Sequence, residues 1–91
     1  MQAPPIKNKC NDIARLRWAC RRGMLELDVL LENFLNEGYS RLTLSEKEQF
    51  IALLNCSDPE LFAWLMGRET PADAAWAALI EKIRQHAQSR I

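Results

Sequence analysis

Two arginines, a glycine and two acids lie together in the segment 18–28, and these residue types are suited to gripping another macromolecule. Arg21 and Arg22 precede Gly23, and Glu26 and Asp28 follow it. An arginine guanidinium is a planar fork that binds carboxylates bidentately. A glycine has no Cβ, so it either ends a helix or lets a partner's backbone approach closely. We therefore expect partner binding here, with both roles of Gly23 open.

Packing alone explains these charges poorly. Arg22 and Glu26 are four residues apart, and in that order a helical pair adds only a few tenths of a kcal/mol. An acid in the first turn of a helix gains about 0.3–1 kcal/mol from the macrodipole, which is the ordinary explanation for Glu26. We expect Arg22→Ala and Glu26→Ala to leave stability nearly unchanged.

Aromatic and basic residues next to this cluster extend the candidate site. Trp18 lies three residues after Arg15 and four before Arg22, so these side chains are predicted to share a helix face. Tryptophan beside arginine is typical of binding hot spots, although a partly buried core indole is the alternative. Tyr39 either anchors a loop onto the bundle or presents its hydroxyl near the cluster.

No comparable arrangement indicates catalysis. The only histidine, His86, is far in sequence from every cysteine, so we interpret it as a solvated residue at a helix end rather than half of a Cys–His couple. No two Cys or His residues have metal-ligand spacing, and the three glycines form no phosphate-binding loop. We predict a non-enzyme with no metal and no cofactor of its own.

Composition limits the remaining classes. The 91 residues suit one domain, and twelve basic and twelve acidic residues cancel, which disfavours nucleic-acid binding. No apolar run approaches the roughly 20 residues of a membrane span. Cys10, Cys20 and Cys56 are odd in number and form no CxxC pair, which favours reduced thiols and a cytoplasmic location.

The hydrophobic spacing predicts an all-α bundle of about five short helices over residues 11–91, after a flexible leader at 1–10. Asn11 or Asp12 is expected to cap the first helix, which ends near Gly23, and the second runs from about 25 to 37. The third is predicted to begin at a Ser45–Glu48 capping box. Ser57 and Pro59 begin the fourth, and Thr70–Asp73 begins the last, which frays after His86. The residues expected in the core are Ile13, Leu16, Cys20, Leu27, Leu30, Leu31, Phe34, Phe50, Ile51, Leu53, Leu54, Leu61, Trp64, Leu65, Trp76, Leu79, Ile80 and Ile83.

The chain also resembles a known family. Arg22-Gly23-Met24-Leu25-Glu26 matches the RGxxE signature of the SdhE family of succinate dehydrogenase assembly factors, within a stretch similar to WACRRGMLELD. The resemblance covers roughly residues 11–80. Downstream of the signature, the residues that follow the family's order and spacing are Phe34, Tyr39, Leu42, Leu44, Glu46, Lys47, Phe50, Leu53, Leu54, Asp58, Leu61, Phe62, Trp64 and Leu65.

This resemblance implies a cytoplasmic helper, expected to be a monomer, that promotes covalent attachment of FAD to the flavoprotein subunit of succinate dehydrogenase, and of the related fumarate reductase. FAD would be handled on that subunit, with Arg22, Gly23 and Glu26 contacting it and Trp18, Arg21, Arg15, Asp28 and Tyr39 contributing. The alternative is a small regulatory adaptor of antitoxin or nucleic-acid-linked type. It is suggested by four arginines on the first helix: Arg15, Arg17, Arg21 and Arg22.

Overall fold

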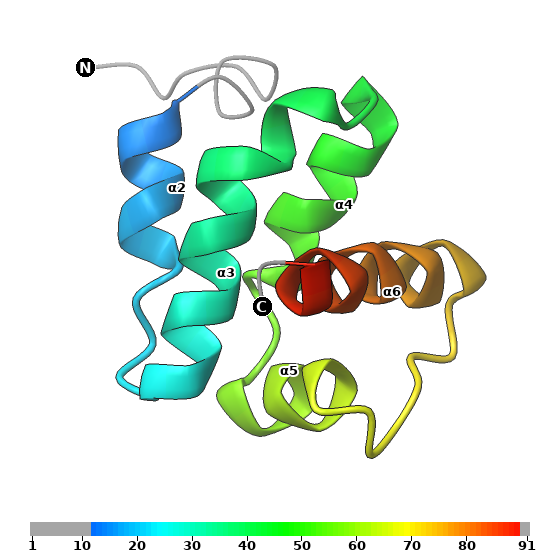
Figure 1. Ribbon diagram of the computed structural model, residues 1–91. Helices are drawn as coiled ribbons and strands as arrows, with labels where there is room; N and C mark the ends of the chain where they lie inside the picture. The colour runs from blue at the N-terminus through cyan, green and yellow to red at the C-terminus, as the bar shows by residue number, and fades with distance from the viewer. Residues whose placement is uncertain (1–11, 90–91) are drawn as a thin grey trace.

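Helices provide the regular structure of residues 12–89, the part of the chain that the computed structural model describes (Figure 1). They are α2 (Ile13–Ala19), α3 (Leu25–Glu37), the 3-10 turn η1 (Tyr39–Arg41), α4 (Leu44–Leu53), α5 (Asp58–Leu65) and α6 (Ala74–Ser89). No strand occurs within 12–89. The predicted all-α bundle is confirmed, while the leader predicted at residues 1–10 lies outside the described residues.

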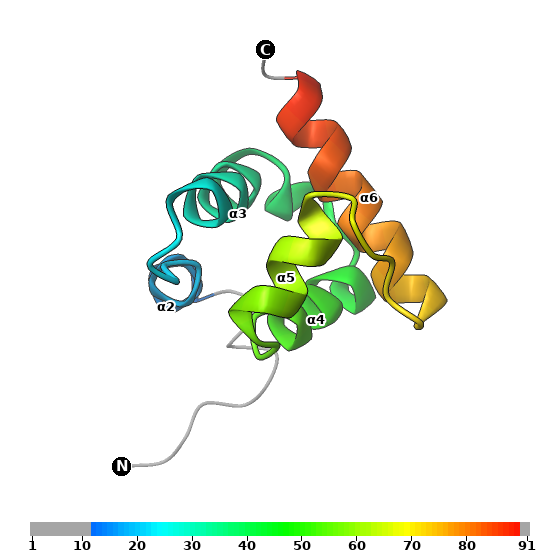
Figure 2. The same ribbon diagram turned by 90° about the horizontal axis from the view of Figure 1, so that it is seen from below.

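The bundle is organised around α6. This helix packs on α3, α4 and α5, and α2 packs on α3 (Figures 1 and 2). The buried stripe of α6 consists of Leu79, Ile80 and Ile83, three of the four residues expected on it. The other buried residues of the hydrophobic core come from the remaining helices and the segments that follow them: Leu16, Cys20, Leu27, Leu31, Phe34, Leu35, Tyr39, Leu42, Phe50, Leu53, Leu54, Leu61 and Leu65.

Local signals placed α3 and α5 correctly. The bounds of α3 match the prediction, and the Ser57 side chain caps α5 in a capping box with Glu60. The end of α5 is a Schellman motif, in which the Arg68 N–H donates to the Ala63 carbonyl and the Gly67 N–H to the Trp64 carbonyl. Gly67 takes the left-handed conformation that this motif needs, with φ at 76°.

The predicted start of α4 was wrong by two residues. Thr43, not Ser45, caps the helix, and its box partner is Glu46 rather than Glu48. Both pairs have the same spacing, so the choice depends on tertiary structure: Lys82 of α6 forms an ion pair with Glu46. The hydrogen bond from Lys82, aided by that from the Thr43 N–H, lowers the pKa of the Glu46 carboxyl.

Three other predicted helix features also needed correction. Asp73, rather than Thr70, caps α6, since its carboxylate accepts from the Ala75 and Trp76 N–H groups. The α6 helix continues through Ser89 instead of fraying after His86. In α2, Asp12 is the cap, as expected, but the helix ends at Ala19, before Gly23.

Some residues expected in the core lie nearer the surface. Ile13 is 38% exposed, because α2 packs on α3 through the face that carries Leu16. Trp64 and Trp76 are half-buried, pack against the core and meet edge to face at 6.0 Å between ring centroids. These two rings therefore lie at the edge of the core and not at its centre.

Candidate functional site

The Arg22–Glu26 segment forms the connection between α2 and α3 and the first turn of α3. The α2–α3 loop, residues 20–24, has Gly23 at a positive φ of 86°. Asp28 reaches back from α3, and its two carboxylate oxygens accept the backbone N–H groups of Arg22 (2.7 Å) and Gly23 (3.2 Å). Asp28, predicted to bind a partner, thus holds the loop backbone in place.

Arg22 turns into the protein, and only 15% of its side chain is exposed. Its Nη1 donates to the carbonyls of Leu54 (2.6 Å) and Ala19 (3.1 Å), and its Nη2 donates to the Cys56 carbonyl (2.8 Å). Its Nε donates to Asp58 Oδ1 at 2.7 Å in an ion pair. The guanidinium therefore binds carbonyls at the C-terminal ends of α2 and α4, where a cation is favoured, and an acid at the start of α5.

This geometry overturns the expectation that Arg22 contributes little to stability. That expectation assumed Glu26, four residues away, as the intramolecular partner of Arg22. The observed acceptors outside the loop region lie 32 to 36 residues further along the chain. Glu26 itself is exposed and makes no hydrogen bond or ion pair with any residue of 12–89.

Gly23 lies on the outside of the loop with free space around it. A Cβ built on Gly23 would have no heavy atom of the described chain within 4 Å. The glycine is therefore required by its backbone conformation, since a left-handed φ is costly for other residues. The same open space leaves room for a partner to approach the backbone.

We expect Gly23→Ala to destabilise the protein by about 1 kcal/mol through its positive φ alone. A thermal melt checks this value. Gly38→Ala is an unsuitable control, because its Cβ would lie 2.8 Å from the Phe34 ring, so Ala78→Gly at an exposed position of α6 serves to calibrate a backbone effect of similar size. A stabilised Gly23→Ala variant would contradict the conformational role.

Apolar side chains surround the Glu26 carboxylate. Leu25 is 79% exposed and Val29 48% exposed, so both apolar side chains face solvent. Two shallow hollows of about 370 Å³ each flank Glu26. Their walls comprise Leu25, Val29, Leu30 and Met66 for one, and Met24, Leu25 and Phe62 for the other. Contiguous exposed apolar surface of this kind is typical of a binding site.

The C-terminal end of α2 adds an exposed aromatic residue. Trp18 is 74% exposed, so it is not a core residue, and the Arg21 guanidinium lies 5.9 Å from its ring centroid. Arg15 is also exposed and pairs with Asp12 at 3.7 Å. The face predicted for Trp18, Arg15 and Arg22 together does not form, because Arg22 lies beyond the helix end and points inward.

Tyr39 belongs to the core rather than to this surface. Tyr39 is only 2% exposed, and its ring centroid lies 5.4 Å from that of Phe50. Lys47 covers it, with Nζ 5.3 Å from the ring centroid. Of the two roles expected for Tyr39, the structure supports anchoring the turn η1 onto the bundle.

The comparisons with known proteins agree with the resemblance. A family model described as "Flavinator of succinate dehydrogenase" matches residues 14–87. The chain belongs to this family. Curated relatives named FAD assembly factor SdhE include one from Shewanella oneidensis, 53% identical over 76 residues, or 84% of this chain and 93% of the relative. Another, from Aliivibrio fischeri, is 46% identical over 78 residues, or 86% of this chain and 91% of the relative.

A solved structure of a similar protein has the same fold. The solution structure of a UPF0350 protein is 43% identical and superimposes with a TM-score of 0.74. The match covers 99% of this chain and 89% of that one. The fold of this family member is therefore that of an experimentally determined relative.

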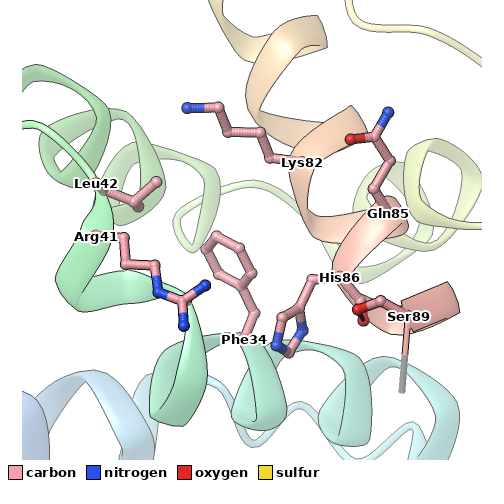
Figure 3. Close-up of a pocket in the computed structure, with 8 residues that line it drawn as sticks. Phe34, Arg41, Leu42, Lys82, Gln85, His86 and Ser89 are labelled. Atoms are coloured by element: carbon pink, nitrogen blue, oxygen red, sulfur yellow. Dashed lines mark hydrogen bonds between the residues drawn. The ribbon is translucent and has the colours of Figure 1, made fainter. Parts of the chain in front are cut away.

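A further hollow lies at the C-terminal end of α3 and is less suited to partner binding than the two beside Glu26. It encloses about 380 Å³, and Figure 3 shows Phe34 between Arg41 and His86, with Lys82 and Gln85 on α6. His86 is not a solvated end residue: its side chain is 17% exposed, its Nε2 lies 3.0 Å from Glu37, and its ring meets Phe34 edge-on. Lys82 and His86 are thus already paired with acids, and these contacts tie α6 to α3 and α4.

The cysteines are structural within the described residues. Cys20 is 1% exposed, as expected for a small buried residue, and burial raises the pKa of its thiol to about 12. Burial also raises the pKa of Cys56, and both thiols are free. Within residues 12–89, no group of His, Cys, Asp and Glu could hold a metal ion, and no helix is long and apolar enough to cross a membrane.

Leu25 and Val29 are surface residues that the spacing did not single out as part of the site. They are four apart and fall off the Leu27–Leu31–Phe34 stripe of α3, so the periodicity places them on a second, solvent-facing side. The presence of two apolar residues four positions apart, outside the core stripe, was the feature of the sequence that could have identified them as part of the site. Their importance depends on exposure, which only the packed structure gives.

Proposed function

We propose that this protein is an FAD assembly factor that binds the immature flavoprotein subunit of succinate dehydrogenase, and of fumarate reductase, and promotes covalent attachment of FAD there. Membership of the family and the names of the relatives support the activity. The observation that supports the binding mode is the carboxylate of Glu26, unpaired among residues 12–89 and set inside an exposed apolar surface. We name this the docking surface and define it as Trp18, Arg21, Leu25, Glu26 and Val29.

The residues of the docking surface and of the loop beside it would contribute to partner binding in different ways. Leu25, Val29 and Trp18 supply apolar area, and Glu26 is available for a basic group of the subunit. We propose that Arg22 and Asp28 hold the loop in place and do not bind the subunit through their charged groups, because these groups are already bound within the protein. Gly23 leaves its backbone open to the subunit.

The mechanism we propose is positional rather than catalytic. By holding the subunit's domains, the factor would bring the flavin and its acceptor side chain into reactive geometry, and positioning alone can contribute several kcal/mol to a barrier. No side chain of the factor needs to exchange protons or electrons with the flavin. We place this activity in the cytoplasm, where the free thiols of Cys20 and Cys56 suit a reducing environment, and we take the factor to act as a monomer.

The alternative, a nucleic-acid-linked adaptor, receives less support from the arginines than their number suggested. Arg22 is bound internally, Arg17 donates to Asn36 at 2.6 Å, and Arg15 pairs with Asp12. Arg21 alone of the four is without an acidic or amide partner within residues 12–89. A strongly basic stripe, which phosphate binding requires, is therefore not formed by α2.

Calorimetric titration tests the proposal directly. The purified protein should bind the apo-flavoprotein subunit as a one-to-one complex, with modest dependence on salt, and should bind free FAD weakly or not at all. A one-site isotherm with FAD at micromolar or tighter affinity would favour a flavin carrier. Affinity for DNA that falls steeply with salt, with no binding to the subunit, would favour the adaptor.

Glu26→Gln should reduce covalent flavin in the subunit while changing the melting temperature little. The carboxylate has no partner within 12–89, so its loss costs at most the first-turn macrodipole contribution, about 0.3–1 kcal/mol. Flavin fluorescence of the denatured subunit in a gel measures the covalent product. Glu48→Gln, an exposed acid on α4, is the matched control and should retain full activity. Equal activity of both variants would remove Glu26 from the docking surface.

A further inference from the structure

The start of α5 contacts the α2–α3 loop through Asp58, a residue outside the Arg22–Glu26 segment. Asp58 is the first residue of α5, its side chain is 36% exposed, and its Oδ1 lies 2.7 Å from Arg22 Nε. The other two nitrogens of the guanidinium donate to backbone carbonyls. Asp58 is therefore the only charged acceptor that the Arg22 guanidinium contacts within residues 12–89.

The ion pair matters for the loop because Arg22 is covalently next to Gly23. The side chain of Arg22 fixes one end of this pair of residues, and the Asp28 carboxylate holds their two N–H groups. The left-handed glycine between the anchors has many accessible conformations once an anchor is lost. Charge-assisted hydrogen bonds such as Arg22–Asp58 are also the stronger ones.

Helix α5 contributes to the docking surface at a second place. Phe62 and Met66, at later positions along α5 and its C-terminal cap, line the hollows on either side of Glu26. A contact that sets the position of the loop relative to the start of α5 therefore also sets the shape of the surface around Glu26. Helix α5 also packs on α3, the helix that carries Glu26, and Figure 2 shows α2 and α3 together on one side of α5.

We propose that Asp58 is a positioning residue for partner binding: it holds the Arg22 fork so that the loop presents Gly23 and Glu26 in the conformation that the flavoprotein subunit binds. This inference rests on the proposed function. It adds a residue that acts through Arg22 and does not itself touch the partner.

The test compares Asp58→Asn with Glu60→Gln in the full-length protein. Both residues are acids in the first turn of α5, but Glu60 completes the capping box and Asp58 alone contacts Arg22. Each substitution removes one negative charge from the first turn of α5, so their effects on the macrodipole should be similar, and a glutamine at position 60 can still complete the capping box. Melting temperatures measure both effects. Titration with the apo-flavoprotein subunit, below both melting temperatures, should show affinity lowered about 10-fold by Asp58→Asn and within about 2-fold of wild type for Glu60→Gln.

A double-mutant cycle separates positioning from general damage. If Asp58 acts through Arg22, adding Asp58→Asn to Arg22→Gln should weaken binding no further than Arg22→Gln alone, because glutamine has neither the charge nor the guanidinium that Asp58 binds. Additive losses, or equal losses from Asp58→Asn and Glu60→Gln, would overturn the proposal. Thermal melts of the single and double variants set the titration temperature, which must lie below all of their melting temperatures.

A readout without the partner makes the outcome independent of the proposed function. In the isolated protein, Asp58→Asn should shift the amide resonances of Arg22 and Gly23 and speed their hydrogen exchange, whereas Glu60→Gln should leave both unchanged. Unchanged loop amides would overturn the positioning role even if binding fell. Failure of the wild-type protein to bind the subunit would instead reject the proposed function while leaving the loop measurement valid.

Discussion

Arg22→Ala is expected to lower the free energy of unfolding by about 2–3 kcal/mol, a larger loss than we expect from any of the other proposed substitutions. The substitution removes an ion pair to Asp58 and hydrogen bonds to three carbonyls, those of Ala19, Leu54 and Cys56. The carbonyls would then be left at the ends of helices without this donor. For a domain of this size the loss corresponds to a fall in melting temperature of about 10–20 °C, which differential scanning calorimetry measures.

The neighbouring arginine provides the control for this prediction. Arg21 is exposed, and its guanidinium lies near the Trp18 ring without a hydrogen bond or ion pair to any residue of 12–89, so Arg21→Ala should change stability by less than about 0.5 kcal/mol. The two variants remove the same charge from adjacent positions, which cancels any effect of net charge. If Arg22→Ala melted within a degree or two of Arg21→Ala, the internal contacts of Arg22 would be energetically unimportant.

A loss of flavinylation in the Arg22→Ala variant would therefore have two causes. The variant both loosens the loop and destabilises the whole bundle, so activity must be measured well below its melting temperature. Glu26→Gln, which leaves the internal contacts intact, isolates the contribution of the docking surface. Lower activity at unchanged stability, as expected for Glu26→Gln, indicates a residue that contacts the partner. Lower activity together with lower stability, as expected for Arg22→Ala, indicates a residue that shapes the site.

Features fixed by neighbouring residues were predictable from the sequence. The bounds of α3 follow from its apolar stripe, and the start of α5 follows from Ser57, Pro59 and Glu60, because each interaction spans at most four residues. The signature Arg22–Glu26 is also local, and it was identified by its resemblance to the SdhE family within the stretch 18–28 and not by periodicity. These are cases in which local chemistry and the final fold agree.

Features fixed by distant partners were not predictable. Two equivalent capping boxes at Thr43 and Ser45 could be separated only by Lys82, which lies on the last helix. Arg22 looked free because its acid, Asp58, is 36 residues away, and His86 looked solvated because Glu37 and Phe34 approach it from α3. In each case a charged or aromatic side chain found a partner through tertiary packing, which single-sequence spacing does not contain.

The exposed leucine at the start of α3 carries the largest expected effect on binding. Leu25→Ser should weaken binding of the flavoprotein subunit about 10- to 100-fold, because burying a leucine side chain in an interface contributes about 1.5–3 kcal/mol and each 1.4 kcal/mol is tenfold in affinity. Stability should hardly change, since the side chain is already 79% exposed in the free protein. Titration calorimetry with the apo-subunit gives the affinity, and a thermal melt gives the stability.

Leu44→Ser is the matched control for Leu25→Ser, because both leucines are the first residue of a helix and both are largely exposed. Leu44 lies at the start of α4, outside the docking surface, so its substitution should leave the affinity within about 2-fold of wild type. Leu25→Met, which keeps an apolar side chain of similar size, should retain most of the binding. Equal losses from Leu25→Ser and Leu44→Ser would show that the partner does not use this end of α3, and the hollows around Glu26 would then need another explanation.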